Sequence, residues 1–298
     1  MKIGYPCINQ SLTCRSSRTF RLRNYTDERL LATLEGNLQC LGEILLYNVN
    51  HGIDFFRITS DLVPFASHPV CTANWQGIFR EPFAALGALI KDNGMRISMH
   101  PDQFNLINAK DPAIFERTIR ELAYHAEVLN LLGLDTSAKI QLHVGGVYGD
   151  PEASIARFID RYPNLPEAIL RRLVIENDDH RYTVRDCLKI HDETGIPIIF
   201  DNLHHRIHAT CEEPVSVIFP EVAATWQSKD GLPMIDFSSQ DPDGRPGKHA
   251  ATIDLPEFLA FTDAIRPFDA DIMLEIKDKE QSAVKALAAM YGDERLIR

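Results

Sequence analysis

Six acidic or imidazole side chains stand at the ends of short apolar runs. These residues are His100, His143, Glu176, Asp201, Asp236 and Glu275. Imidazole and carboxylate together suit borderline divalent ions such as Mn²⁺, Zn²⁺ or Fe²⁺, and the absence of nearby cysteine argues against a purely structural zinc site. The glutamate in LVIEND is informative, because a buried carboxylate is costly unless it meets a metal or another cation.

Three histidines in the segments that follow such runs enlarge the set: His68, His204 and His249. The combined set exceeds what one ion can use, so we predict a cluster of two or three divalent ions, with Glu176 or Asp201 as a bridging carboxylate. Such a cluster generates hydroxide at neutral pH and clamps the attacking and leaving oxygens of an in-line displacement. We therefore predict metal-dependent hydrolysis of a phosphodiester.

Alternating short and long apolar patterns indicate the elements that must position these residues. The β-branched and apolar runs predict strands at 3–5, 55–58, 96–99, 139–142, 173–175, 197–200, 234–237 and 272–276. Helical spacing predicts helices at 27–48, 76–92, 112–132, 151–160, 184–193, 214–226, 256–264 and 281–290. This alternation is typical of βαβ units on a parallel sheet.

Eight strand–helix pairs in 298 residues, with no low-complexity linker, predict a single (β/α)₈ TIM barrel over residues 1–298. The alternative is an open doubly wound sheet, but no glycine-rich phosphate-binding loop follows an early strand. A TIM barrel places its chemistry at the C-terminal ends of its strands, where the imidazoles and carboxylates stand.

Composition limits the function classes. The chain has 31 basic and 42 acidic side chains and a formal net charge of −11, which argues against sequence-independent coating of nucleic acid. No apolar run approaches the length of a membrane span, and the N-terminus lacks the features of a secretory signal. The cysteines are scattered without a CxxC pair, so we predict a reduced, cytoplasmic setting; they are Cys7, Cys14, Cys40, Cys71, Cys187 and Cys211.

The N-terminal segment has the opposite charge. Up to Thr26 the chain carries only basic charged side chains: Lys2, Arg15, Arg18, Arg21 and Arg23. Most of them lie in the segment after the first predicted strand, on the face expected to carry the metals. We predict that the four arginines include phosphate contacts.

Motifs in a fixed order resemble those of the UV damage endonuclease family. They are RITSDLVP with a trailing SHP, SMHPDQF, LVIEND, IIFDNLHH, IDFSSQ with a trailing GKH, and MLEIKDKE. The resemblance implies a TIM barrel related to endonuclease IV that nicks double-stranded DNA immediately 5′ of cyclobutane dimers, 6-4 photoproducts and abasic sites. It implies 3′-hydroxyl and 5′-phosphate products, no ATP or other nucleotide cofactor, and a monomer.

The family resemblance also implies a metal cluster, usually of manganese ions. The matching ligands are His68, His100, His143, Glu176, Asp201, His204, His249 and Glu275. The seventh strand departs from the family, which carries a lysine and, two residues later, a histidine ligand where this chain has Met234 and Asp236. Asp236 is a harder ligand, so we expect Mn²⁺, with Mg²⁺, Co²⁺ and Zn²⁺ as alternatives.

The resemblance further implies residues that contact the DNA. Gln103 and Phe104 match a wedge that fills the gap left by the lesion, and Tyr5 and Asn9 match residues that line the lesion pocket. Extrusion of the damaged nucleotides is expected, because a phosphodiester held in an intact stack is out of reach.

We assign catalytic roles to Glu176, Glu275 and Lys277. Lys277 either approaches the scissile phosphate or pairs with a strand-end carboxylate.

Three alternatives stay open. A metal-dependent sugar isomerase or epimerase of the same barrel class would also gather His, Asp and Glu at the strand ends, but it leaves the arginine segment and Gln103–Phe104 unexplained. An enzyme restricted to abasic sites is the second alternative. The third is a damage-binding protein that no longer cuts because of its changed seventh strand.

Overall fold

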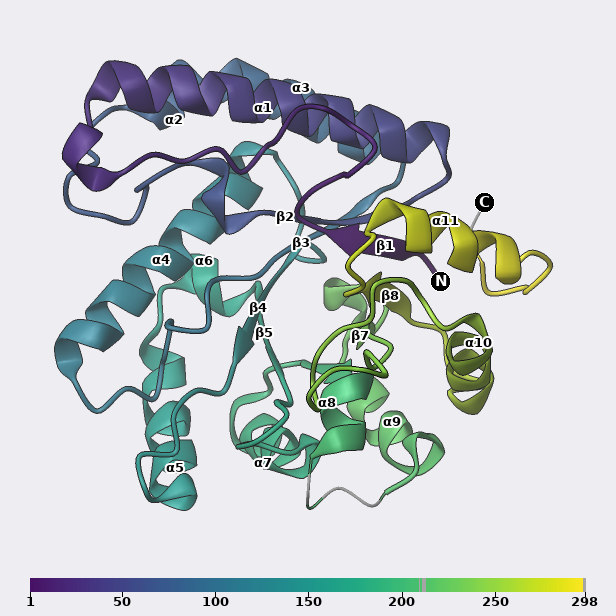
Figure 1. Ribbon diagram of the computed structural model, residues 1–298. Helices are drawn as coiled ribbons and strands as arrows, with labels where there is room; N and C mark the ends of the chain where they lie inside the picture. Colours follow the sequence, from purple (N-terminus) through teal and green to yellow (C-terminus); the bar gives the residue numbers. More distant parts are fainter. Residues whose placement is uncertain (209, 211–212, 297–298) are drawn as a thin grey trace.

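A closed barrel of eight parallel strands forms the centre of the molecule (Figure 1). The computed structural model describes residues 1–208, 210 and 213–296. The strands are β1 Ile3–Pro6, β2 Phe55–Ile58, β3 Arg96–Met99, β4 Lys139–His143, β5 Leu173–Glu176, β6 Ile198–Asp201, β7 Met234–Phe237 and β8 Asp271–Leu274. Each strand pairs with the next and β8 pairs with β1, so the predicted TIM barrel is confirmed.

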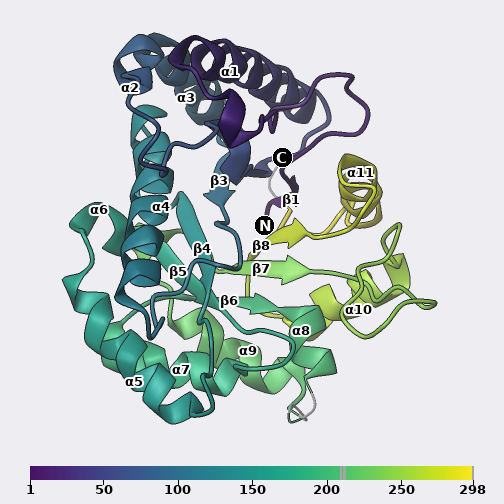
Figure 2. The ribbon, with the colours of Figure 1, turned by 60° about the vertical axis from the view of Figure 1, so that its left-hand side comes forward.

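Helices surround the barrel, as Figures 1 and 2 show from two directions. They are α1 Asp27–Asn50, α2 Trp75–Ile78, α3 Arg80–Asp92, α4 Pro112–Leu131, α5 Pro151–Arg161, α6 Glu167–Leu170, α7 Val184–Thr194, α8 Asn202–Ile207, α9 Val215–Ala224, α10 Leu255–Ala264 and α11 Glu280–Ala289. The predicted helix 76–92 is divided at Phe79 into α2 and α3. The short helices α6 and α8 were not predicted.

Local sequence fixes where the longer helices begin and end. The side chains of Asp111, Asp150 and Asp254 accept hydrogen bonds from first-turn amides of α4, α5 and α10, and a proline occupies the first turn of each helix. Gly195 ends α7 with a φ of 72°, a conformation that favours glycine.

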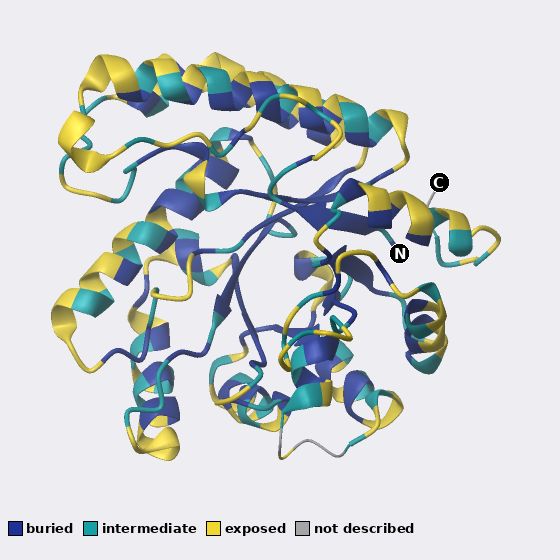
Figure 3. Cartoon of the chain, in the orientation of Figure 1, coloured by how far each residue is buried: buried dark blue, intermediate teal, exposed yellow. Residues whose placement is uncertain are grey.

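The main hydrophobic core lies between the barrel and its helices. Figure 3 shows buried strands and helices whose buried faces turn toward them. Along each strand successive side chains point to opposite sides, so alternate residues enter this outer core and the others enter the barrel. Gly4 permits the close approach of β1 and β2, because a Cβ there would lie 1.8 Å from the Phe55 carbonyl oxygen.

The barrel interior is filled in layers. Polar residues close the N-terminal end, where Arg96 donates to Asp271 at 2.7 Å and Lys139 donates to Asp230 at 2.6 Å. The next layer is an apolar cluster of Phe55, Val174, Ile199, Trp226, Met234 and Met273. Met234 therefore packs among apolar side chains, where a charged lysine would be costly. Two residues further along the same strands, the side chains are a guanidinium and four carboxylates: Arg57, Glu176, Asp201, Asp236 and Glu275.

A disulfide joins Cys14, in the arginine segment, to Cys40 on α1. The scattered cysteines predicted a reduced setting without such a bond, and this prediction is wrong for Cys14 and Cys40. Cys7, Cys71 and Cys187 are free, and Cys211 lies outside the described residues. Among the described helices, none has the length and apolar character required to cross a membrane.

Candidate metal centre

Strand register brings the strand-end residues together. His143 on β4 is level with Glu176 on β5, and Asp201 on β6 is level with Asp236 on β7. All four occupy positions whose side chains enter the barrel. Parallel strands end on the same side of the barrel, so residues far apart in sequence meet in one cup.

Glu176 is the centre of the first group of ligands. Its Oε1 lies 3.0 Å from His100 Nε2 and 3.0 Å from His143 Nε2. His100 Nδ1 is 2.7 Å from the Pro101 carbonyl oxygen, which orients that ring. His143 Nδ1 is buried and has no hydrogen-bond partner. One ligand atom from each of the three residues fits within a 4.8 Å group that could hold a metal ion.

A second group of ligands shares Glu176. Carboxylate oxygens of Glu176, Asp201 and Asp236 also lie within 4.8 Å of one another. Asp201 accepts from the His204 amide at 2.8 Å, and its other oxygen lies 3.3 Å from His204 Nδ1. Glu176 therefore belongs to both groups, as expected of a bridging carboxylate.

The third part of the centre is at β8. Glu275 is partly buried, and its Oε2 lies 4.0 Å from His249 Nδ1. His249 is held there by an isolated bridge with Gln240 in the segment after β7. His249 and Glu275 thus approach each other beside the first two groups.

Arg57 and Gln141 were missed at the level of sequence. Arg57, on β2, donates to Asp236 Oδ1 at 2.6 Å and to Gln141 Oε1 at 2.7 Å, and it forms an ion pair with Glu275. The Gln141 amide donates to Glu176 and to the second oxygen of Asp236. Side chains alternate between the inside and the outside of the barrel along each strand. This alternation could have revealed both residues, because Arg57 and Gln141 lie two residues after the inward-facing Phe55 and Lys139.

The pKa values of two carboxyl groups of the centre reflect how deeply they are buried. Burial, reinforced by neighbouring carboxylates, raises the pKa of Asp201 to about 7. Burial also raises the pKa of Asp236, although Arg57 opposes this shift. Burial is the first cause of both shifts, so an ionised carboxylate at either position requires a cation beside it.

The imidazoles of the centre differ in their protonation. Burial would lower the pKa of His100 and of His204, but neighbouring carboxylates raise both, to about 9 for His204. Burial lowers the pKa of His143, which favours the neutral form that binds a metal. Burial would raise the pKa of Glu176, but His143 and His100 hold it well below the ordinary value, so this carboxylate is ionised. A buried anionic oxygen shared by two imidazoles, beside the unpartnered Nδ1 of His143, fits divalent cations.

Two predicted site residues belong to neither of the two ligand groups. His68 is exposed, and its Nδ1 accepts from the Val70 amide at 3.0 Å. Lys277 is also exposed and lies 3.5 Å from Asp241, in the segment after β7. Lys277 therefore pairs with a loop carboxylate and with neither Glu275 nor another strand-end carboxylate.

The residues assigned to the lesion pocket are buried. The Tyr5 hydroxyl donates to Asn48 Oδ1 at 2.7 Å and accepts from Asn9 Nδ2 at 2.9 Å. The Tyr5 ring also packs edge-on against Phe56. Both Tyr5 and Asn9 are inaccessible to DNA in this conformation.

The wedge and phosphate candidates are exposed. Gln103 and Phe104 follow β3, and Phe104 is 75% exposed. The four arginines of the N-terminal segment are exposed as well: Arg15, Arg18, Arg21 and Arg23. Asn37 on α1 ties this segment down, since its side chain exchanges hydrogen bonds with the backbone of Arg18.

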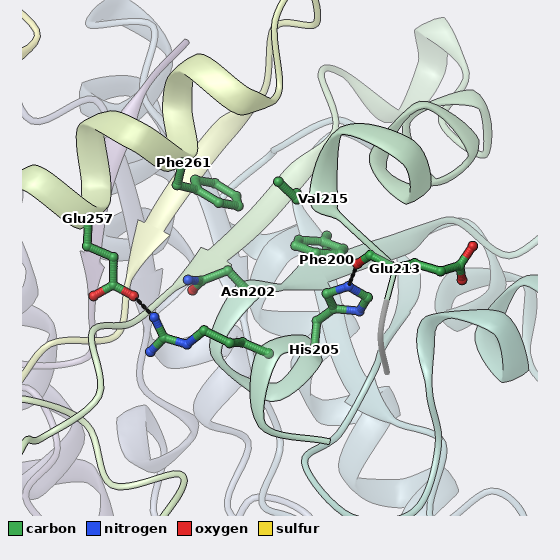
Figure 4. A pocket seen from close by; sticks show the side chains of 8 residues that line it. Phe200, Asn202, His205, Glu213, Val215, Glu257 and Phe261 are labelled. Atoms are coloured by element: carbon green, nitrogen blue, oxygen red, sulfur yellow. Dashed lines mark hydrogen bonds and ion pairs between the residues drawn. The ribbon is translucent and has the colours of Figure 1, made fainter. Parts of the chain in front are cut away.

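A separate cavity of about 330 Å³ lies beside α8, on the outer side of β6 (Figure 4). It is lined by aromatic side chains and by polar side chains that have partners, although the buried Nδ1 of His205 has none. His205 Nε2 lies 2.8 Å from the Glu213 carbonyl oxygen, and Arg206 forms an ion pair with Glu257. Phe200 faces this cavity while the adjacent Asp201 faces the barrel, so the cavity is separate from the metal centre.

The fold and the site define a TIM-barrel protein with imidazoles and carboxylates gathered at the C-terminal mouth. The chain belongs to the UV-endonuclease UvdE family, whose sequence model matches residues 1–295. It is therefore an enzyme of that family.

Similar proteins cover nearly the whole chain. The UV DNA damage endonuclease of Clostridium perfringens (strain 13 / Type A) is 36% identical over 291 residues, which are 97% of this chain and 71% of the relative. The UV DNA damage endonuclease of Bacillus cereus (strain Q1) is 32% identical, and the match covers 99% of this chain and 97% of the relative. The crystal structure of SacUVDE matches with a TM-score of 0.94 and 42% identity, and the match covers 99% of this chain and 100% of that chain.

Sugar epimerases share only the architecture. D-psicose 3-epimerase from Clostridium cellulolyticum H10 covers 99% of this chain and 99% of its own, with a TM-score of 0.59 and 12% identity. This similarity shows the fold alone. Family membership favours the nuclease over the sugar isomerase or epimerase.

Proposed function

We propose that the protein nicks double-stranded DNA immediately 5′ of UV photoproducts and abasic sites, leaving a 3′-hydroxyl and a 5′-phosphate. The names of the relatives at 32–36% identity support the damage-directed nuclease activity. The observation that carries a hydrolytic mechanism is the convergence of His100, His143, Glu176 and Asp201 from four strands. The proposal includes Mn²⁺ as the ion, and a cytoplasmic monomer with one catalytic domain over residues 1–298.

Different residues of the chain would hold the metal ions and orient their ligands. Two or three divalent ions would be held by His100, His143, Glu176, Asp201 and His204, with His68, His249 and Glu275 as further ligands. When bound, such ions supply Lewis acidity and a nucleophile derived from water at neutral pH. Gln141 orients the bridging carboxylate Glu176 through its amide.

Binding of damaged DNA is assigned to exposed residues on the same side of the barrel. The arginine segment after β1 would contact phosphates, and Gln103 and Phe104 after β3 would fill the gap beside extruded nucleotides. Phe104 offers a ring for stacking, which suits this role because stacking tolerates any base.

A plasmid-nicking assay tests the proposal. Supercoiled plasmid is left intact, irradiated with ultraviolet light, or depurinated, and each sample is incubated with protein and Mn²⁺ or with chelator. We expect relaxation of both damaged plasmids, no relaxation with chelator, and ends that a DNA polymerase can extend. Relaxation after depurination alone would indicate an abasic-site enzyme, and binding without relaxation would indicate a damage-binding protein.

A further inference from the structure

The metal centre has two chemically different halves. The half built by β3 to β6 contains the imidazoles of His100, His143 and His204, and among the described ion pairs its carboxylates Glu176 and Asp201 pair with these imidazoles. The half at β7 and β8 contains the carboxylates of Asp236 and Glu275, and a guanidinium lies between them. The halves are therefore neutralised by different means.

Arg57 has little freedom to leave its position. Its side chain is 3% exposed, it is 2.6 Å from Asp236, and it forms an ion pair with Glu275. Gln141 completes this arrangement: its oxygen accepts from Arg57 at 2.7 Å, while its amide donates to Asp236. Both oxygens of Asp236 are thus engaged by donors of the protein.

We propose that Arg57 is a fixed cation of the centre, which takes the place of one divalent ion between Asp236 and Glu275. The chain then binds two exchangeable ions, in the half built by β3 to β6, and Asp236 is the partner of Arg57 instead of a metal ligand. A divalent ion close to the guanidinium would be repelled by it, and both oxygens of Asp236 already accept a hydrogen bond from the protein. This inference rests on the proposed metal-dependent function.

Metal content tests the inference without reference to activity. Wild type, Asp236→Asn, Glu176→Gln and Arg57→Met are loaded with Mn²⁺, desalted and analysed by elemental mass spectrometry. We expect two ions per chain in wild type and in Asp236→Asn, with Kd values within about threefold of each other. Glu176→Gln should lose at least one ion, and Arg57→Met should gain one between the two released carboxylates.

Thermal melting with Mn²⁺ and with chelator is the control that shows whether each variant is folded. Arg57→Met leaves two buried carboxylates without their cation, so its stability should depend on Mn²⁺ far more than that of wild type. Asp236→Asn keeps the ion pair of Arg57 with Glu275 and decides the question alone if Arg57→Met does not fold.

Other patterns of metal content overturn the inference. Three ions in wild type, a tenfold or greater loss of Mn²⁺ affinity in Asp236→Asn, or a folded Arg57→Met that binds two ions would each refute the fixed cation. These results would leave damage-dependent nicking intact. A wild-type protein that binds no Mn²⁺ would refute the metal-dependent function together with the inference.

Discussion

Replacing Glu176 by glutamine removes the carboxylate on which the two ligand groups converge. Its Oε1 lies 3.0 Å from both His100 Nε2 and His143 Nε2, and the residue is only 2% exposed. Glutamine preserves the shape of the side chain and its approach to Gln141. The substitution therefore isolates the charge.

The expected size of the effect follows from electrostatics. At an effective dielectric constant of about 20, a unit charge attracts a divalent ion about 4 Å away by about 8 kcal/mol. Desolvation of the buried carboxylate offsets more than half of this attraction, so about 3 to 4 kcal/mol is lost on substitution. This corresponds to a decrease in Mn²⁺ affinity of about 100- to 1000-fold.

Mn²⁺ titration by calorimetry measures the binding, and nicking of irradiated plasmid measures the function. Glu152→Gln is the matched control, because Glu152 is exposed on α5 and forms only a surface ion pair with Lys189. The control should match wild type in both assays. The reasoning fails if folded Glu176→Gln binds Mn²⁺ within threefold of wild type, or cuts irradiated DNA at the wild-type rate.

Three further predictions concern other parts of the chain. Phe104→Ala should leave unfolding unchanged but weaken binding of irradiated DNA by about 1 to 3 kcal/mol in a fluorescence titration, because the exposed ring is lost from stacking. Arg96→Met should lower the free energy of unfolding in urea by about 3 to 5 kcal/mol, since buried Asp271 loses its partner, while nicking per folded molecule stays unchanged. The pKa of Asp293 is lowered to about 2, and its hydrogen bond with Arg295 is the main cause. The ionised carboxylate should therefore add at most about 2 kcal/mol to the free energy of unfolding above pH 4. Asp293→Asn should therefore lower the melting temperature at pH 6, and the difference should disappear as the pH falls toward 2.

The barrel could be predicted because its signals are local. Each strand is a short buried run, and the helices α4, α5 and α10 carry capping aspartates and first-turn prolines. The division of the predicted helix 76–92 at Phe79 and the short helix α8 are not marked by such signals. Their form depends on packing against the finished barrel.

The candidate centre could be predicted in part. Strand-end imidazoles and carboxylates were recognisable because the end of an apolar run is visible in sequence. The Cys14–Cys40 disulfide was not, since its formation depends on where the arginine segment crosses α1. The burial of Tyr5 and its hydrogen bonds to Asn9 and Asn48 could not be predicted either, because Asn48 comes from α1, far away in the chain.

Arg57 shows why charge balance cannot be inferred from the ligand residues alone. It lies on β2, inside an apolar run, and its partners Asp236 and Glu275 are more than 170 positions away in the chain. Barrel closure brings β2 and β8 to either side of β1, so a guanidinium that enters from one side meets carboxylates from the other. An aspartate at position 236 would add an uncompensated charge unless a cation stood beside it, and Arg57 is that cation.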